Sequence, residues 1–184
     1  MKDKKLQYAT QFMIERYSAW YTHMLTLHLL DTKECTYIKS GGWSKGAIQR
    51  TSSELTDDAA KSSLRYFIEV LNYKLHGRKT RKKRYKDKCR ILAIPVFEGA
   101  KNNKRRHFHI LLGNVPQDKL VDLEKTIADC WADTKWSMAG IKLEEIYNAD
   151  GAAFYLRKEV GYCNDDAVLW EFASIPNRLI GKSA

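Results

Sequence analysis

One stretch constrains this chain more than any other, residues 105–113, which read Arg-Arg-His-Phe-His-Ile-Leu-Leu-Gly. The apolar run that starts at Phe108 is typical of a buried β-strand. Side chains alternate between the two faces of a strand, so His107 and His109 are expected on one face and Phe108 in the core. The two imidazoles would lie about 6–7 Å apart along the strand, within reach of one metal ion. Two histidines on a solvated sheet face explain the pattern equally well.

A second apolar run lies just upstream, over residues 90–97, and is followed by Glu98 and Gly99. The linker 100–104 is polar, so the two runs predict a β-hairpin. A hairpin folds the end of its first strand against the start of its second, which places Glu98 beside His107. Two histidines and a carboxylate suit a divalent ion that also holds a substrate oxygen. We therefore predict that Glu98, His107 and His109 bind a metal; the alternative for Glu98 is a surface carboxylate.

Residues 152–162 predict a helix that follows Asp150-Gly151 and ends near Gly161. Tyr155 and Lys158 are three residues apart and would share one helix face. Tyr162 would lie on the same side if the helix continues past Gly161. A tyrosine hydroxyl is a workable nucleophile when a metal activates its target and a cation lies nearby. An amphipathic helix with a tyrosine at the core boundary has the same pattern.

The order of these motifs resembles that of the HUH endonuclease superfamily: a carboxylate, then His-apolar-His, then Tyr-x-x-Lys. Residues 25–27, Leu-Thr-Leu, also resemble the first-strand motif of rolling-circle replication initiators, so the resemblance spans roughly residues 21–162. A tyrosine after the histidines matches the initiators and differs from conjugative relaxases. The position four residues before Tyr155 is Gly151, so a paired nucleophile there is absent and Tyr162 is the candidate second tyrosine.

The resemblance implies an α+β fold, a central antiparallel sheet with helices packed on it, in the HUH/Rep nuclease-like (ferredoxin/RRM-like) arrangement. We expect residues 1–184 to form one such endonuclease domain without a helicase or ATPase. The implied activity is sequence-specific nicking and joining of single-stranded DNA, to initiate rolling-circle replication of a plasmid or phage. Tyr155 would form a 5′-phosphotyrosine intermediate, Lys158 would assist it, and the metal would be Mg²⁺ or Mn²⁺. The implied partners are single-stranded DNA at a replication origin, near a hairpin, and a host helicase.

Two alternatives stay open, a single-tyrosine HUH transposase and a non-catalytic domain that binds single-stranded nucleic acid. The net charge of +10 favours a polyanionic partner in every case. The densest positive charge falls in residues 78–88, which are either a solvated basic loop or a clamp on the DNA backbone. The residues predicted to contact DNA are Arg78, Lys79, Arg81, Lys82, Lys83, Arg84, Arg105 and Arg106.

The remaining segments predict the scaffold. Strands are expected at 24–30 and 141–147, and His28 is interpreted as a sheet residue in preference to a metal ligand. Helices are expected over 4–20, from the capping signals at 51–54 to residue 76, and over 114–131. Residues 31–53 are polar and rich in Gly, Ser and Thr, and residues 40–46 within them predict a loop, in which Trp43 either stacks on a base or anchors the loop. The four cysteines are scattered, and the sequence shows neither a secretory signal nor an apolar stretch of membrane-spanning length. These features predict a cytoplasmic protein without a membrane partner.

Overall fold

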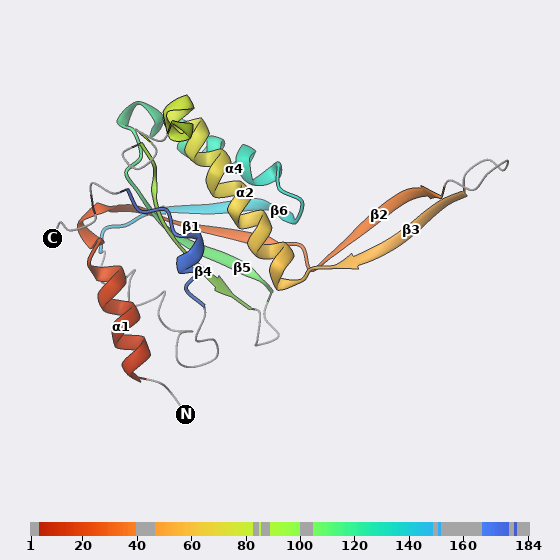
Figure 1. Ribbon diagram of the computed structural model, residues 1–184, viewed down its shortest axis with the longest axis horizontal. Coiled ribbons are helices and arrows are strands. Elements are labelled where there is room, and N and C mark those ends of the chain that lie inside the picture. The colour runs from red at the N-terminus through yellow and green to blue at the C-terminus, as the bar shows by residue number, and fades with distance from the viewer. Residues whose placement is uncertain are drawn as a thin grey trace.

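An antiparallel four-stranded sheet with the order β4-β5-β1-β6 lies at the centre of the chain (Figure 1). The computed structural model describes residues 4–39, 47–82, 85, 89–99, 105–148, 151, 167–176 and 179. The strands of this sheet are β1 (Tyr21–Leu29), β4 (Leu92–Glu98), β5 (His107–Gly113) and β6 (Ser137–Glu145). The predicted hairpin is confirmed, because β4 and β5 pair from Leu92↔Gly113 to Glu98↔His107. With helices on this sheet, the fold is α+β, as the sequence predicts.

Two helices, α2 (Asp57–His76) and α4 (Leu123–Ala132), cover one face of the sheet (Figure 1). Alternate residues of β1 and β5 point into the core beneath them, which explains the apolar alternation of both strands. The centre of this core is aromatic: the ring of Trp131 meets Phe67 edge to face at 5.6 Å between centroids. Helix α4 contributes Leu123, Ile127 and Trp131 to this core, and all three are buried.

The opposite face of the sheet is covered over β4 and β5. Helix α1 (Lys4–Glu15) contributes Ile14, and the chain after it contributes Tyr17, to a second buried cluster. Residues 167–176 run along β4, where the carbonyl of Ala167 accepts a hydrogen bond from Phe97 N–H at 2.8 Å. Ile94 and Val96 of β4 belong to this second core. Their side chains alternate along the strand with Ala93 and Phe97, which belong to the first core. The described part of the C-terminal tail therefore packs on the body of the protein.

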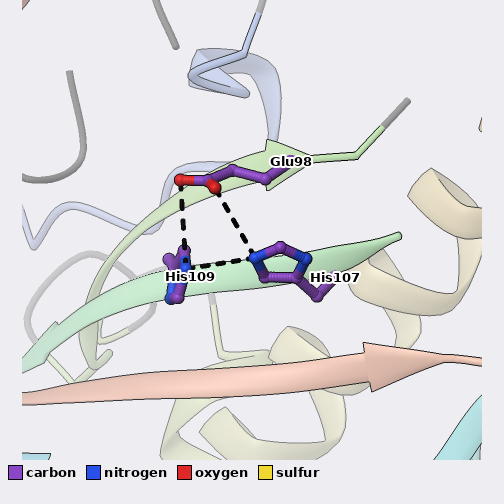
Figure 2. Close-up of side chains that lie close together, drawn as sticks. All are labelled: Glu98, His107 and His109. Atoms are coloured by element: carbon purple, nitrogen blue, oxygen red, sulfur yellow. Dashed lines mark hydrogen bonds and ion pairs between the residues drawn. The ribbon is translucent and has the colours of Figure 1, made fainter. Parts of the chain in front are cut away.

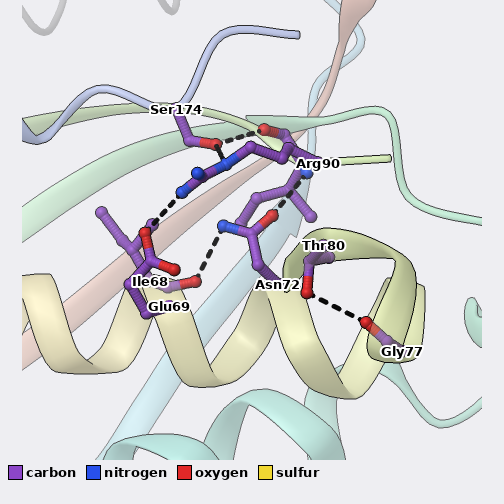
Figure 3. Close-up of polar contacts among 8 residues, drawn as sticks. Ile68, Glu69, Asn72, Gly77, Thr80, Arg90 and Ser174 are labelled. Carbon is purple, nitrogen blue, oxygen red and sulfur yellow. Dashed lines mark hydrogen bonds and ion pairs between the residues drawn. The ribbon is translucent and has the colours of Figure 1, made fainter. Parts of the chain in front are cut away.

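A buried polar network ties α2 to the start of β4 and to the tail (Figure 3). The Asn72 side chain is fully buried and accepts a hydrogen bond from Ile91 N–H at 2.9 Å. Ser174 donates its hydroxyl to the Ile91 carbonyl at 2.9 Å, and Arg90 donates to both Ser174 and Glu69. Because this network satisfies groups that are removed from water, it fixes where β4 lies against the helix layer.

Helix α2 begins later than the sequence predicts. Residues 51–54 belong to a strand, so the capping prediction there is wrong. Thr56 is the actual N-cap, and its side-chain oxygen accepts a hydrogen bond from Ala59 N–H at 3.2 Å. Two acidic residues, Asp57 and Asp58, follow in the first turn, where the helix dipole stabilises negative charge.

The predicted loop at 40–46 lies outside the described residues, and the polar segments on either side of it form a two-stranded ribbon that the sequence analysis does not predict. Strands β2 (Thr32–Lys39) and β3 (Ala47–Glu54) pair only with each other and extend away from the sheet (Figure 1). The described side chains at its base, Thr32 to Glu34, are exposed. β-Branched residues such as Thr36 and Ile48 favour strands, whereas the prediction gave more weight to the Gly and Ser between them. Trp43 lies outside the described residues.

The other element boundaries differ more modestly. The first helix ends at Glu15 and a 3-10 turn, η1 (Ser18–Trp20), follows. A second such turn, η3 (Gln117–Lys119), replaces the early part of the predicted helix over 114–131, and β6 starts earlier than predicted. No helix in the described ranges combines the length and apolar character needed to cross a membrane.

Candidate metal centre

Two rows of residues cross the sheet at the end where β4 finishes. In the first row Glu98 of β4 lies opposite His107 of β5, which lies opposite His28 of β1. In the second row His109 lies between Val96 and Thr26. Residues directly opposed across antiparallel strands share a face, and so do residues two apart along one strand. These side chains therefore share the face that α2 and α4 do not cover.

Three of these side chains converge, as the sequence predicts (Figure 2). The Nε2 atoms of His107 and His109 are 3.2 Å apart. The Glu98 carboxylate oxygens lie 3.6 Å from His107 Nε2 and 3.9 Å from His109 Nε2. Ligand atoms bound to neighbouring positions of one ion at about 2.1 Å are about 3 Å apart, so a small shift of the side chains would close them around a cation.

The hydrogen bonds of the two rings hold both Nε2 atoms toward the same point. His107 Nδ1 lies 2.8 Å from the Arg105 carbonyl oxygen, which can only accept, so Nδ1 carries the proton. In the neutral ring Nε2 then presents a lone pair. His109 Nδ1 lies 3.0 Å from the hydroxyl of Thr26, which holds this ring in a similar way. Such outer contacts are typical of histidines that bind metals.

Burial of the carboxylate also fits a cation. Glu98 is 3% exposed and His109 is 6% exposed. An ionised carboxylate that is removed from water requires positive charge close to it. A divalent cation between Glu98 and two neutral imidazoles supplies that charge. The residues present therefore fit a metal ion, and this donor set accepts Mn²⁺, Fe²⁺ or Zn²⁺ as well as Mg²⁺.

Thr26 tests the role of the outer contacts. Replacing Thr26 with Val keeps the shape of the side chain but removes the oxygen that holds His109. We expect the affinity for Mn²⁺ to fall about 10- to 100-fold, the usual cost of losing such a support. Isothermal titration with Mn²⁺ measures this, and Thr26→Ser, which keeps the hydroxyl, is the matched control. Equal affinity in the Val variant and the wild type would show that Thr26 does not orient the ring.

Among the predicted DNA-binding residues that the structure describes, only Arg105 lies beside the cluster with an exposed side chain. Its Nη1 atom lies 3.7 Å from the sulfur of Met138, so the side chain extends toward β6. Arg106 is instead engaged inside the protein, because it donates to the Leu55 carbonyl at 2.7 Å and faces Asp57 at 3.8 Å. It therefore holds the start of α2.

The described residues of the basic run are not brought together with the metal cluster. Arg78, Lys79, Arg81 and Lys82 are exposed in and after η2 (Gly77–Arg81), which follows the far end of α2. Strand β4 runs from that end of the sheet to Glu98, a distance of about 20 Å at about 3.4 Å per residue. Lys83 and Arg84 lie outside the described residues. A DNA strand that contacts both regions would therefore have to span the length of the sheet.

Lys142 is a cation near the cluster that sequence reasoning did not single out. It lies opposite Thr26 on β6, on the same sheet face, and its exposed ammonium pairs with Glu144 at 2.9 Å. The position of Lys142 follows from the register of β6 against β1. A signal for it exists in the sequence, because Lys142 alternates with the apolar residues Ile141 and Leu143.

The predicted tyrosine motif, Tyr155, Lys158 and Tyr162, lies outside the described residues. The described chain resumes at Ala167, which is bonded to Phe97, the neighbour of Glu98.

No protein-family model, curated protein or solved structure matches this chain. Inference about its function therefore depends on the chemistry of its own residues. The convergence of Glu98, His107 and His109 is the most specific chemical feature among the described residues.

Proposed function

We propose that this chain nicks and joins single-stranded DNA by the HUH mechanism, with Tyr155 as nucleophile and a divalent ion held by Glu98, His107 and His109. The observation that carries the proposal is the convergence of these three side chains, whose ligand atoms all lie within 4.8 Å of one another. A net charge of +10 supports a polyanionic substrate. The motif order, with a tyrosine and lysine after the histidines, supports this chemistry over metal binding for structure alone.

The chemistry requires few protein groups. A bound divalent ion would polarise the scissile phosphate and offset the charge that develops on its oxygens. The phenol oxygen of Tyr155 loses its proton and forms a bond to phosphorus. The bond from phosphorus to the 3′ oxygen breaks, and that oxygen takes up a proton. The products are a 5′-phosphotyrosine and a free 3′-hydroxyl, and attack by such a hydroxyl reverses the step and rejoins the strand.

The other residues assist this exchange. An ordinary phenol is protonated at neutral pH, so the ammonium of Lys158 would favour the phenolate. Arg105 lies beside the cluster and would contact the DNA backbone. We propose that the free 3′-hydroxyl primes rolling-circle replication of a plasmid or phage. The origin would be presented as a single strand near a hairpin, and a host helicase would open the duplex.

A covalent-adduct assay tests this function. The protein is mixed with a labelled pool of random single-stranded oligonucleotides and Mn²⁺, and the products are separated on a denaturing gel. The wild type is expected to give a metal-dependent, heat-stable shifted band, because the phosphotyrosine bond survives denaturation. Tyr155→Phe should lose the band, because it lacks the attacking oxygen, while DNA binding in native gels is kept. Tyr162→Phe is the matched control and should retain the band.

Three other results would change the proposal. A band that survives in Tyr155→Phe and disappears in Tyr162→Phe would move the nucleophile to Tyr162. A wild type that binds oligonucleotides tightly without forming an adduct would favour the non-catalytic binding domain. An adduct formed by a dimer on hairpins at the ends of a mobile element would favour the transposase.

A further inference from the structure

A third histidine, His28, lies beside the candidate metal ligands, in the row of residues that contains Glu98 and His107. His28 lies directly opposite His107 across the β1–β5 pair, so the row reads Glu98, His107, His28 over three strands. The ring centroids of His28 and His107 are 5.6 Å apart, with the ring planes tilted by 38°. His28 is half-buried, at the end of β1 beside the base of the β2–β3 ribbon. Its imidazole thus borders the site on the side opposite the Glu98 carboxylate.

The bonding of His28 differs from that of the two metal-binding candidates. His107 and His109 each have Nδ1 held by a protein oxygen. His28 has no hydrogen bond within the described part of the chain, and its Nδ1 is enclosed without a partner there. Because Nδ1 is enclosed, a group that approaches from solvent can meet this ring only at Nε2. An Nε2–H at the edge of a polar site is suited to donate to an oxygen of an incoming ligand.

The covered and open parts of the sheet face define how a substrate approaches. Over β4 the described tail packs against the sheet, where Val168 bridges to Val96. Over β1 and β6 the same face carries the exposed cations Arg105 and Lys142. A phosphate group moving in from this side would pass over His28 before it reached the point where the three ligand side chains converge.

We propose that Nε2–H of His28 donates a hydrogen bond to a non-bridging oxygen of the phosphate that the metal centre binds. This inference rests on the proposed function, because it assigns a contact to the substrate of the same site. His28 is not one of the three residues whose ligand atoms lie within 4.8 Å of one another. A contact with the phosphate therefore fits its position better than a bond to the ion. His28 then becomes a substrate-binding residue that distinguishes a bound phosphodiester from a bound ion alone.

Nuclear magnetic resonance of ¹⁵N-labelled imidazoles tests the contact without measuring catalysis. The probe is the dinucleotide thymidylyl-(3′→5′)-thymidine, added to the full chain with Mg²⁺. Mg²⁺ alone is expected to shift the ring resonances of His107 and His109. Adding the dinucleotide is expected to shift the Nε2 resonance of His28 downfield and to slow exchange of its proton with water.

Two variants separate the nitrogens of His28. A glutamine amide nitrogen falls near the position of Nε2, whereas an asparagine amide nitrogen falls near that of Nδ1. His28→Gln is therefore expected to bind the dinucleotide within about threefold of the wild type. His28→Asn is expected to bind it about tenfold or more weakly, the usual effect of losing one hydrogen bond to a charged group. Affinity for Mg²⁺ alone should be equal in all three proteins.

The possible results distinguish failure of the His28 contact from failure of the proposed function on which it rests. If Mg²⁺ and the dinucleotide shift His107 and His109 but not His28, and both variants bind equally well, the contact is wrong and the metal-dependent function stands. If His28→Asn binds the dinucleotide as well as the wild type while His28→Gln does not, the contact is wrongly assigned to Nε2. If neither Mg²⁺ nor Mn²⁺ shifts any of the three rings, the metal centre itself fails, and the contact with it.

Discussion

Replacing His109 with alanine is expected to lower the affinity for Mn²⁺ by more than about 100-fold and to abolish the covalent adduct. Loss of an outer support costs about 10- to 100-fold, and His109 would be a direct ligand, so its loss should cost more. Isothermal titration with Mn²⁺ measures the affinity. The matched control is His23→Ala, because His23 lies near the other end of β1, bonded to Thr22 at 2.8 Å. That variant should bind Mn²⁺ as the wild type does.

Thermal unfolding gives an independent check on the His109 variant. A ligand that binds only the folded state stabilises it by RT ln(1 + [L]/Kd), about 2.7 kcal/mol at a concentration of 100 Kd. Mn²⁺ should therefore raise the Tm of the wild type and of His23→Ala, and a chelator should reverse the rise. The His109 variant should show no such rise. If Mn²⁺ stabilises that variant as much as the wild type, the ion binds elsewhere.

The metal cluster could be predicted from the sequence because its geometry is local. Alternation along a strand places His107 and His109 on one face, and a hairpin brings Glu98 beside them, whatever the rest of the fold does. The contact of Thr26 with His109 could not be predicted in this way, because the two residues are 83 positions apart in sequence. Only the pairing of β1 with β5 brings it there. The same pairing places His28, which the sequence alone identifies only as a sheet residue.

Sequence proximity was misleading for the basic run. Residues 78–88 lie shortly before the strand that carries Glu98, but the described residues of the run lie at the opposite end of that strand. A β-strand is extended, so the first residue of β4 lies about 20 Å from Glu98 at its other end. Closeness in sequence predicts closeness in space across a tight turn, as between Glu98 and His107, but not along an extended strand.

Replacing Phe108 with alanine is expected to lower the free energy of unfolding by about 3–5 kcal/mol, the usual cost of truncating a buried aromatic side chain. Phe108 is fully buried between the two histidines in sequence. Its ring stacks on Phe97 at 4.9 Å and meets Trp131 edge to face at 6.4 Å. Urea denaturation measures the loss. Phe108→Leu keeps most of the volume and should cost markedly less. A loss below about 1 kcal/mol in the alanine variant would contradict this packing.

The same residue connects the stability of the sheet to the metal centre. A slip of one residue in β5 would exchange its two faces, turning both histidines into the core and Phe108 out of it. Burial of Phe108 therefore holds His107 and His109 on the face of Glu98. Phe108→Leu keeps this preference, so its Mn²⁺ affinity should stay within about threefold of the wild type. In Phe108→Ala, saturating Mn²⁺ should recover part of the lost stability, because the ion binds only the register that the aromatic core selects.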